Sequence, residues 1–421
     1  MLARLLIILV VLVVVWRSGW TDIFLSSGTI HERKVPMLDV EYSLAQGYTT
    51  LDRIRSAAGL QGFERNEHLE ATANAHAEYL VRNHEESHYE MEGHPGFTGQ
   101  SHVERALKQG YLSKYSSENL STKNPTVSNS IDGLFSAIYH RFGFLDPTMD
   151  EIGLGVVQDQ NDTANTAYVY VMGNRGLNSR CAQPAQMKSG KYWLVCNDPS
   201  KMIWEREYKE AINTPKRFAP KLIRYPYDNQ KEVPPVFYNE EPDPLPDYDV
   251  SGFPITVTFN DYYFKKPEVL SFELRDQNGN SIKTRYLHAA NDPNARLKPL
   301  QFALLPLKRL DYDTAYQVIL EYKDRGKANI SKWQFRTRSF DEPFFRIDDL
   351  LAEITVTPKS SNILYFPPKD PHDLLTDIQF PDDIYVNFID HNTIRLTVGE
   401  DTPDDFTIKS GDREVHVQIA Q

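Results

Sequence analysis

The stretch HRFGFLDPTMDEIGLG, residues 140–155, decides the fold of the first half of the chain. It overlaps the end of a helical candidate that runs from Ser130 to Phe142. Its last residues begin GLGVVQ, residues 153–158, whose composition indicates a β-strand. A second strand candidate, AYVYVMG, follows at residues 167–173. Upstream, LEATANAHAEYLVRN, residues 69–83, repeats its apolar positions with the 3.6-residue period of an amphipathic helix. The pattern predicts a domain that mixes helices and strands.

Side chains suited to chemistry lie in the deciding stretch and in two earlier strings. SHYEMEGHPGFTG, residues 87–99, contains His88, SSENLS contains Glu118, and the deciding stretch opens on His140. Two imidazoles and a carboxylate in one cleft would suit metal ligation, proton transfer or the binding of a polar ligand.

In their order along the chain, these strings resemble the CAP superfamily, which is also called SCP-like or cysteine-rich secretory. The matching strings are LDRIRSAAGLQGFERNEHLEATANAHAEYL, ESH, PGFTGQSHVERALKQGY, SENLS and HRFGFLDPTMDEIGLG. The resemblance implies an α–β–α sandwich over residues 45–200, with a cleft lined by two histidines and two glutamates. His88, Glu118 and His140 match three of these four positions.

The fourth family position is a glutamate on the helix before the second histidine. LFSAIYH, residues 134–140, offers no counterpart, and Asp132 is the nearest carboxylate. This gap weighs against a strict four-residue metal or acid–base scheme. We expect Ser117 and Arg141 to line the same cleft; alternatively, Arg141 pairs with a neighbouring carboxylate such as Asp146.

Three uses of the cleft remain open at this stage. His88, Glu118 and His140 would form a three-ligand site for a divalent metal such as zinc. A His–Glu pair would also serve as a general base for water. The third possibility is structural, with the same side chains bonded to backbone groups that hold the cleft loops.

The resemblance implies a binding module of the cell envelope, whose partner is an envelope polymer, a lipid or a protein. Two alternatives stay open. One is a hydrolase, metal-assisted or based on His and Glu, that acts on peptide or glycan; the other is a purely architectural envelope protein. Enzymatic activity is uncertain and less expected than binding, because fold alone does not fix function.

The N-terminus predicts export. Arg4 precedes an uninterrupted apolar run from Leu5 to Trp16, and Arg17 follows. As a helix this run would cover roughly 18 Å at about 1.5 Å per residue, against a hydrocarbon core of about 30 Å. Residues 1–25 therefore suit a signal peptide, or a membrane anchor if the flanking arginines snorkel. We expect a periplasmic or extracellular protein, with cleavage or retention of the segment left open.

The two cysteines of the chain, Cys181 and Cys196, lie close together in the sequence. In an exported chain they are expected to form one disulfide, with two buried thiols as the alternative. Without a local histidine partner they do not make a zinc site.

The net charge of −12 is concentrated at the C-terminus, where residues 340–421 hold 17 acidic and 6 basic side chains. Since no basic stripe occurs, a nucleic-acid partner is not expected.

Beyond the first domain, the sequence predicts all-β modules. Residues 201–245 are dense in proline and tyrosine and indicate a semi-rigid linker. Residues 246–340 alternate apolar and polar positions, which predicts a sandwich similar to bacterial Ig-like domains. Residues 343–421 predict a small acidic β domain. The fold class is therefore α+β: a CAP α–β–α sandwich followed by an Ig-like sandwich and an acidic β domain.

Overall fold

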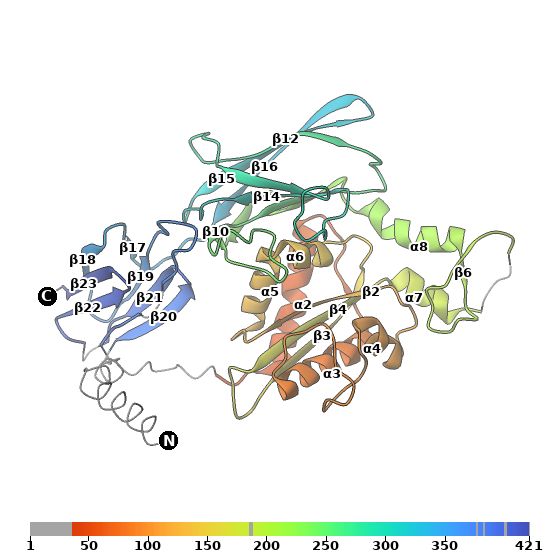
Figure 1. Ribbon diagram of the computed structural model, residues 1–421, viewed down its shortest axis with the longest axis horizontal. Coiled ribbons are helices and arrows are strands. Elements are labelled where there is room, and N and C mark those ends of the chain that lie inside the picture. Colours follow the sequence, from red (N-terminus) through yellow and green to blue (C-terminus); the bar gives the residue numbers. More distant parts are fainter. Residues whose placement is uncertain (1–35, 185–187, 376–377, 382–383, 400–401, 421) are drawn as a thin grey trace, which may run out of the picture. The chain divides into compact units, whose positions relative to one another are not determined.

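The computed structural model describes residues 36–184, 188–375, 378–381, 384–399 and 402–420. The chain divides into two compact units, one that ends at Ser339 and one that contains everything from Phe340 onward (Figure 1). The apolar run Leu5–Trp16 lies outside the described residues. Within the described ranges, no helix combines the length and apolar character that crossing a membrane requires.

The first domain is built on a mixed four-stranded sheet. Its elements are α2 Val40–Ala57, β1 Glu64–Arg65, α3 Glu67–Asn83, α4 His102–Lys108, β2 Ser116–Thr122, α5 Val127–Ser136, α6 Ile138–Phe144, β3 Glu151–Gln158 and β4 Thr166–Gly173. The strand order is β1-β3-β4-β2, with β1 parallel to β3 and the other pairs antiparallel. Helices α3 and α4 cover one face of the sheet, and α2, α5 and α6 cover the other (Figure 1). The predicted α–β–α sandwich is confirmed.

Two glycines of the deciding stretch explain why α3 lies flat on β3. A Cβ atom on Gly153 would fall 2.0 Å from the backbone of Leu69, and one on Gly155 would fall 2.3 Å from the backbone of Ala73. No side chain fits in that space, so the helix backbone approaches the strand directly. The EIGLG motif thus encodes a close helix–sheet contact.

A small lobe follows the first domain. It consists of α7 Arg175–Ala182, β5 Tyr192–Trp193, β6 Ile203–Trp204 and α8 Glu205–Phe218. A disulfide joins Cys181 to Cys196 in its centre, as expected from the sequence. Tyr208, Ala211 and Ile212, spaced for one helix face, pack α8 against the buried disulfide.

Removing this disulfide is expected to destabilise the chain. The bridge closes a loop of 15 residues, for which the loss of chain entropy predicts about 3 kcal/mol of stability. Urea unfolding of wild type should shift to lower urea when reductant is added. The Cys181→Ala/Cys196→Ala variant should have a urea midpoint close to that of the reduced wild type, and reductant should not change this midpoint. A variant as stable as the oxidised protein would contradict the prediction.

Two further four-stranded sheets form a β-sandwich in the same compact unit. The strands are β7 Leu222–Tyr225, β8 Gln230–Val233, β11 Ile255–Phe259, β12 Glu268–Arg275, β13 Thr284–His288, β14 Gln301–Pro306, β15 Ala315–Asp324 and β16 Lys327–Thr337, with a short pair formed by β9 Val236–Phe237 and β10 Ser251–Gly252. One sheet has the order β13-β14-β11-β7 and the other β12-β15-β16-β8. This all-β region is consistent with an Ig-like module.

The structure differs from the sequence-based linker at residues 201–245. That stretch contains helix α8, and its strands β7 and β8 are edge strands of the two sandwich sheets. The prolines of this stretch are spread from Pro215 to Pro244. They interrupt the short apolar stripe of α8 and the brief strands, so the sequence pattern of these elements is weak. The sandwich therefore begins before residue 246, and residues 222–233 belong to it rather than to a spacer.

One buried apolar cluster runs from the first domain into the sandwich. Phe135 of α5 packs against Tyr225 of β7, with ring centroids 5.0 Å apart. Phe253, Val257 and Leu320 continue the same cluster inside the sandwich. Since both share a core, the first domain and the sandwich are one folded body.

The unit from Phe340 onward contains a four-stranded and a three-stranded sheet around its own core. Its strands are β17 Phe344–Arg346, β18 Leu351–Val356, β19 Ser361–Tyr365, β20 Tyr385–Asp390, β21 Thr393–Thr397, β22 Asp405–Ser410 and β23 Arg413–Ile419. The orders are β17-β19-β21-β20 and β18-β23-β22. Apolar residues such as Leu364, Ile394 and Val417 fill its interior. The predicted all-β character of this region is confirmed.

Candidate functional site

His88 and Glu118 meet as the sequence predicts. His88 Nδ1 lies 2.9 Å from Glu118 Oε1, and the His88 side chain is 42% exposed while that of Glu118 is fully buried. Arg105, from α4, donates to both carboxylate oxygens of Glu118 at 3.0 and 2.8 Å. The partly exposed imidazole of His88 is therefore hydrogen-bonded to the carboxylate of a buried ion pair, Glu118 with Arg105.

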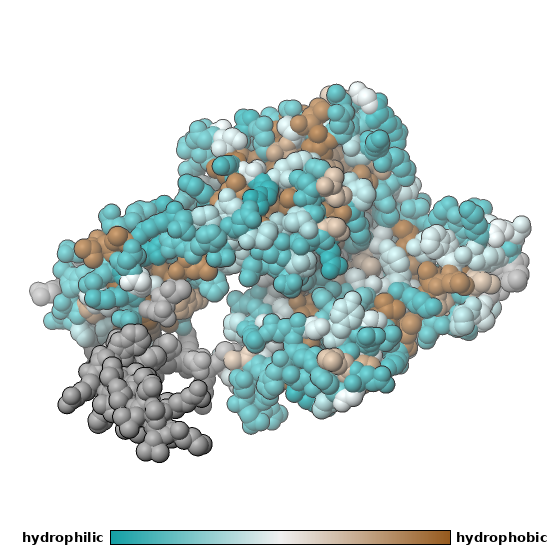
Figure 2. Space-filling view, in the orientation of Figure 1, coloured by the Kyte–Doolittle hydropathy of each residue, from teal (hydrophilic) through white to brown (hydrophobic). Residues whose placement is uncertain are grey.

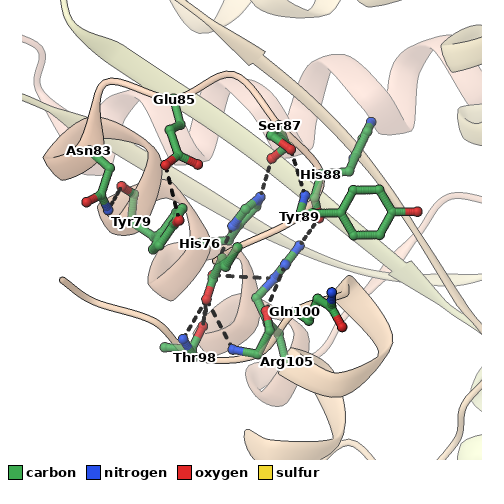
Figure 3. A network of polar contacts seen from close by, with 12 residues as sticks. His76, Tyr79, Asn83, Glu85, Ser87, His88, Tyr89, Thr98, Gln100 and Arg105 are labelled. Atoms are coloured by element: carbon green, nitrogen blue, oxygen red, sulfur yellow. Dashed lines mark hydrogen bonds and ion pairs between the residues drawn. The ribbon is translucent and has the colours of Figure 1, made fainter. Parts of the chain in front are cut away.

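The buried pair belongs to a larger network on α3 and the loop that follows it. His76 Nδ1 lies 3.0 Å from Glu90 Oε1, and its Nε2 lies 3.0 Å from the carbonyl of Ser87. Figure 3 shows His76 directed at Ser87, with Arg105 reaching toward His88 beside it. Because both partners of His76 are acceptors, both ring nitrogens donate and the ring is positively charged. Two buried cations therefore balance two buried carboxylates.

The electrostatics of the network keep Glu118 ionised. Burial alone would raise the pKa of Glu118, but the hydrogen bond from His88 and the charges of Arg105 and His76 lower this pKa to about 2. An ionised carboxylate only accepts hydrogen bonds. His88 Nδ1 must then carry the hydrogen, so Nε2 is the ring nitrogen that Glu118 does not engage.

His140 has a carboxylate partner that sequence reasoning missed. Its Nδ1 lies 2.9 Å from Glu240 Oε1, and the Glu240 side chain is fully buried. The same oxygen accepts from the backbone N–H groups of Tyr139 and His140 at 2.8 and 3.2 Å. Glu240 thus caps the first turn of α6 and orients the imidazole.

Glu240 supplies a second carboxylate beside a cleft histidine, and Asp132 does not. Asp132, the nearest carboxylate in sequence, instead lies 3.6 Å from Arg338 of the sandwich. Glu240 lies 100 positions from His140, near the end of residues 201–245, the stretch predicted to be a linker. No local pattern marks such a contact, and only the folding of the connection onto α6 brings it about.

The two imidazoles face each other in one cleft. The rings of His88 and His140 stack with centroids 6.4 Å apart and an angle of 22° between their planes. Both lie in a cavity of about 460 Å³. Its lining comes from both parts of the folded body: Ser117, Glu118, Asn119 and Tyr139 from the first domain, Glu241 and Pro242 from the connection, and Arg296, Lys298 and Gln301 from the sandwich. The cleft is therefore closed on one side by the sandwich.

Of the two further residues expected in the cleft, one lies there and one does not. Ser117 lines the cavity, and its hydroxyl is buried without a hydrogen-bond partner among the described residues. Arg141 is completely buried and points into the contact with the sandwich, where it donates to the carbonyls of Phe135 and Pro254. The expectation for Arg141 was wrong, because the helical turn directs adjacent side chains to different faces. Its alternative partner Asp146 is instead paired with Lys298.

The predicted zinc ligands do not form a three-ligand set. Glu118 is held by Arg105 through both oxygens, so its carboxylate is not free to ligate. Among the residues that the structure describes, no group of three or more His, Cys, Asp or Glu side chains is arranged around a metal position. What remains for a metal is the pair of imidazole nitrogens, fewer than the three protein ligands of an open zinc site.

Comparisons with known proteins agree with this fold. The model of the CAP, or cysteine-rich secretory protein, family matches residues 48–174, within the range predicted from the sequence. This part of the chain is a CAP domain, and all-β modules follow it. No curated protein matches the chain.

Several solved structures are similar to about a third of the chain. An outer surface protein of Borrelia burgdorferi is 17% identical at a TM-score of 0.29, over 32% of this chain and 95% of that protein. An extracellular SCP-domain protein of Bacillus anthracis is 17% identical at a TM-score of 0.28, over 33% of this chain and 44% of that protein. A cysteine-rich secretory protein of Staphylococcus aureus is 19% identical at a TM-score of 0.25, over 33% of this chain and 40% of that protein. The chain thus spans less than half of the last two proteins.

Proposed function

We propose that this chain is an exported protein of the cell envelope whose CAP cleft binds a polar ligand. The carrying observation is the pair of stacked imidazoles, each backed by a buried carboxylate, in a cavity of about 460 Å³. On each ring the carboxylate engages Nδ1, so Nε2 is left to hydrogen-bond a hydroxyl or amide group of the ligand. The disulfide, the apolar N-terminal run and the secretory family support export. An envelope polymer, a lipid or a protein is the partner we expect.

A capture experiment tests the proposal. Immobilised wild type, incubated with envelope extract, should retain a ligand that the His88→Ala/His140→Ala variant does not retain. The exposed Glu67 on α3 provides a matched control, since Glu67→Gln should capture as wild type does. The face over α3 and α4 is mostly hydrophilic in Figure 2, so unspecific adhesion there should be weak. Equal capture by wild type and the double variant would refute the cleft as the binding site.

Glu240→Gln should weaken binding of the captured ligand about tenfold. Glutamine still accepts from the N–H groups that cap α6, so the helix is kept, but the negative charge behind His140 is lost. A charged hydrogen bond is worth roughly 1.5–3 kcal/mol, and about 1.4 kcal/mol corresponds to tenfold in affinity. Isothermal titration calorimetry measures the change; an unaltered affinity would show that Glu240 has only a structural role.

Hydrolysis is a second candidate, favoured by the same two His–Glu pairs. An imidazole whose Nδ1–H is held by a carboxylate is oriented to take a proton from water through Nε2. Peptidoglycan or a peptide library incubated with wild type should then show turnover that the His140→Ala variant lacks. Absence of turnover in wild type leaves binding as the function of the cleft.

A further inference from the structure

A loop of the sandwich forms one wall of the histidine cavity. Residues 289–300 connect β13 to β14. Arg296 and Lys298 of this loop, with Gln301 at the start of β14, line the same cavity as His88 and His140. The sandwich therefore contributes cations to a site that the CAP domain begins.

The loop is fixed to the CAP domain at the residue next to the cleft histidine of α6. Asp292 accepts hydrogen bonds from the backbone N–H groups of Asn294, Arg296 and Leu297 at 3.1, 2.6 and 2.8 Å. It also accepts a short hydrogen bond from the hydroxyl of Tyr139. Asn294 Nδ2 donates to the same hydroxyl at 3.1 Å. Because Tyr139 directly precedes that histidine, the loop and the imidazole are held at a set spacing.

The backbone of the loop is strained directly before Arg296. Ala295 has a φ of 52°, in the left-handed region that residues with a Cβ atom rarely adopt. Such conformations persist only where the surroundings impose them, and they gather at functional sites. Here the hydrogen bonds to Asp292 on both sides of Ala295 impose it, and Arg296 lies at the cavity as a result.

Among the described residues that line the cavity, Arg296 is a cation without an ion-pair partner. Lys298 Nζ lies 3.1 Å from Asp146 Oδ2. The guanidinium of Arg296 makes no hydrogen bond or ion pair with any residue that the structure describes, and the exposed side chain of Glu241 makes none either. Glu118 is already balanced by its own buried arginine. Arg296 is thus free to bind an anion, with Glu241 as the charge that opposes it.

We propose that Arg296, assisted by Lys298, forms an anion-binding subsite for a carboxylate or phosphate group of the ligand that the histidines hold. A guanidinium presents paired N–H donors that match both of these groups. The proposal rests on the proposed function of the cleft and adds the chemical class of its ligand. The sandwich then takes part in recognition rather than acting as a spacer.

Inorganic phosphate and acetate are the probes for this subsite. Each is titrated into the whole protein at constant ionic strength, with chloride as the balancing ion, while the imidazole resonances of His88 and His140 are followed by NMR. Wild type should show saturable shifts, and Arg296→Gln should bind at least about tenfold more weakly. Glu241→Gln should bind more tightly than wild type, because it removes the opposing charge. Comparison of the two probes tells whether phosphate or carboxylate is preferred.

Arg180→Gln is the matched control, since Arg180 is an exposed arginine on α7 outside the cavity; it should bind as wild type does. Equal thermal stability of Arg296→Gln and wild type excludes a folding defect. Shifts that do not saturate in wild type, or that are the same in Arg296→Gln, would overturn the subsite. Ligand capture that succeeds while the anion titration fails removes this inference alone. Saturable anion binding without ligand capture supports the subsite and removes the proposed function alone.

Discussion

Replacing Arg105 with methionine is expected to lower the free energy of unfolding by roughly 3–5 kcal/mol, the cost of removing one partner from a buried ion pair. Arg105 is fully buried and holds both oxygens of Glu118, and its Nε lies 3.7 Å from Glu90. Without the guanidinium, two buried carboxylates would share the single charge of His76. Urea unfolding at pH 7 measures the loss.

The same contact gives the protein an acid-dependent stability. The pKa of Glu118 in the folded state is lowered to about 2, below the value of about 4.3 for an exposed glutamate. The resulting stability is fully present above about pH 4.3 and is lost as the pH falls toward 2. In Arg105→Met the pKa of Glu118 rises, so this part of the acid dependence should shrink. Urea midpoints recorded from pH 7 to pH 3 for both proteins test whether stability falls with pH and whether the fall is smaller in Arg105→Met.

Arg65 offers a control for the effect of burial. Its ion pair with Glu70 has the same 2.8 Å separation, but the Arg65 side chain is 62% exposed. Arg65→Met should cost less than about 1 kcal/mol, as exposed ion pairs do. A loss for Arg105→Met as small as that for Arg65→Met would show that the buried network is not what stabilises the cleft.

The sequence predicts the fold and half of the site because those features depend on local patterns. The period of residues 69–83 places α3, and flanking motifs identify His88, Glu118 and His140. Glu240 escapes prediction because its contact with His140 spans 100 positions and depends on a connection with irregular structure. Its neighbours in sequence are prolines and other carboxylates that are less buried than Glu240, so nothing in the local sequence distinguishes Glu240 from them.

Arg141 is the opposite case, because the sequence suggests a cleft residue and the structure buries it against the sandwich. Its replacement by methionine is the second large effect that we expect. Its guanidinium donates to Phe135 at 2.6 Å and to Pro254 at 2.7 Å, and it lies over the rings of Tyr225 and Phe253 at 4.9 and 4.8 Å. Methionine leaves these buried carbonyls without donors, at about 1–3 kcal/mol each, and loses the contacts with the rings. We expect Arg141→Met to cost roughly 3–5 kcal/mol, measured by urea unfolding.

This variant should also weaken ligand binding, although Arg141 does not touch the cavity. Arg141 ties α6 to the strand that begins at Ile255, and Glu240 reaches His140 only while the connection before that strand lies against α6. A loosened contact would let Glu240 withdraw, and His140 would lose the carboxylate that fixes its Nδ1–H. Arg141→Met and Glu240→Gln should therefore reduce affinity in the same direction, and combining them should add little, since both act through one contact. Full additivity of the two losses would mean that Arg141 stabilises the body without positioning the cleft.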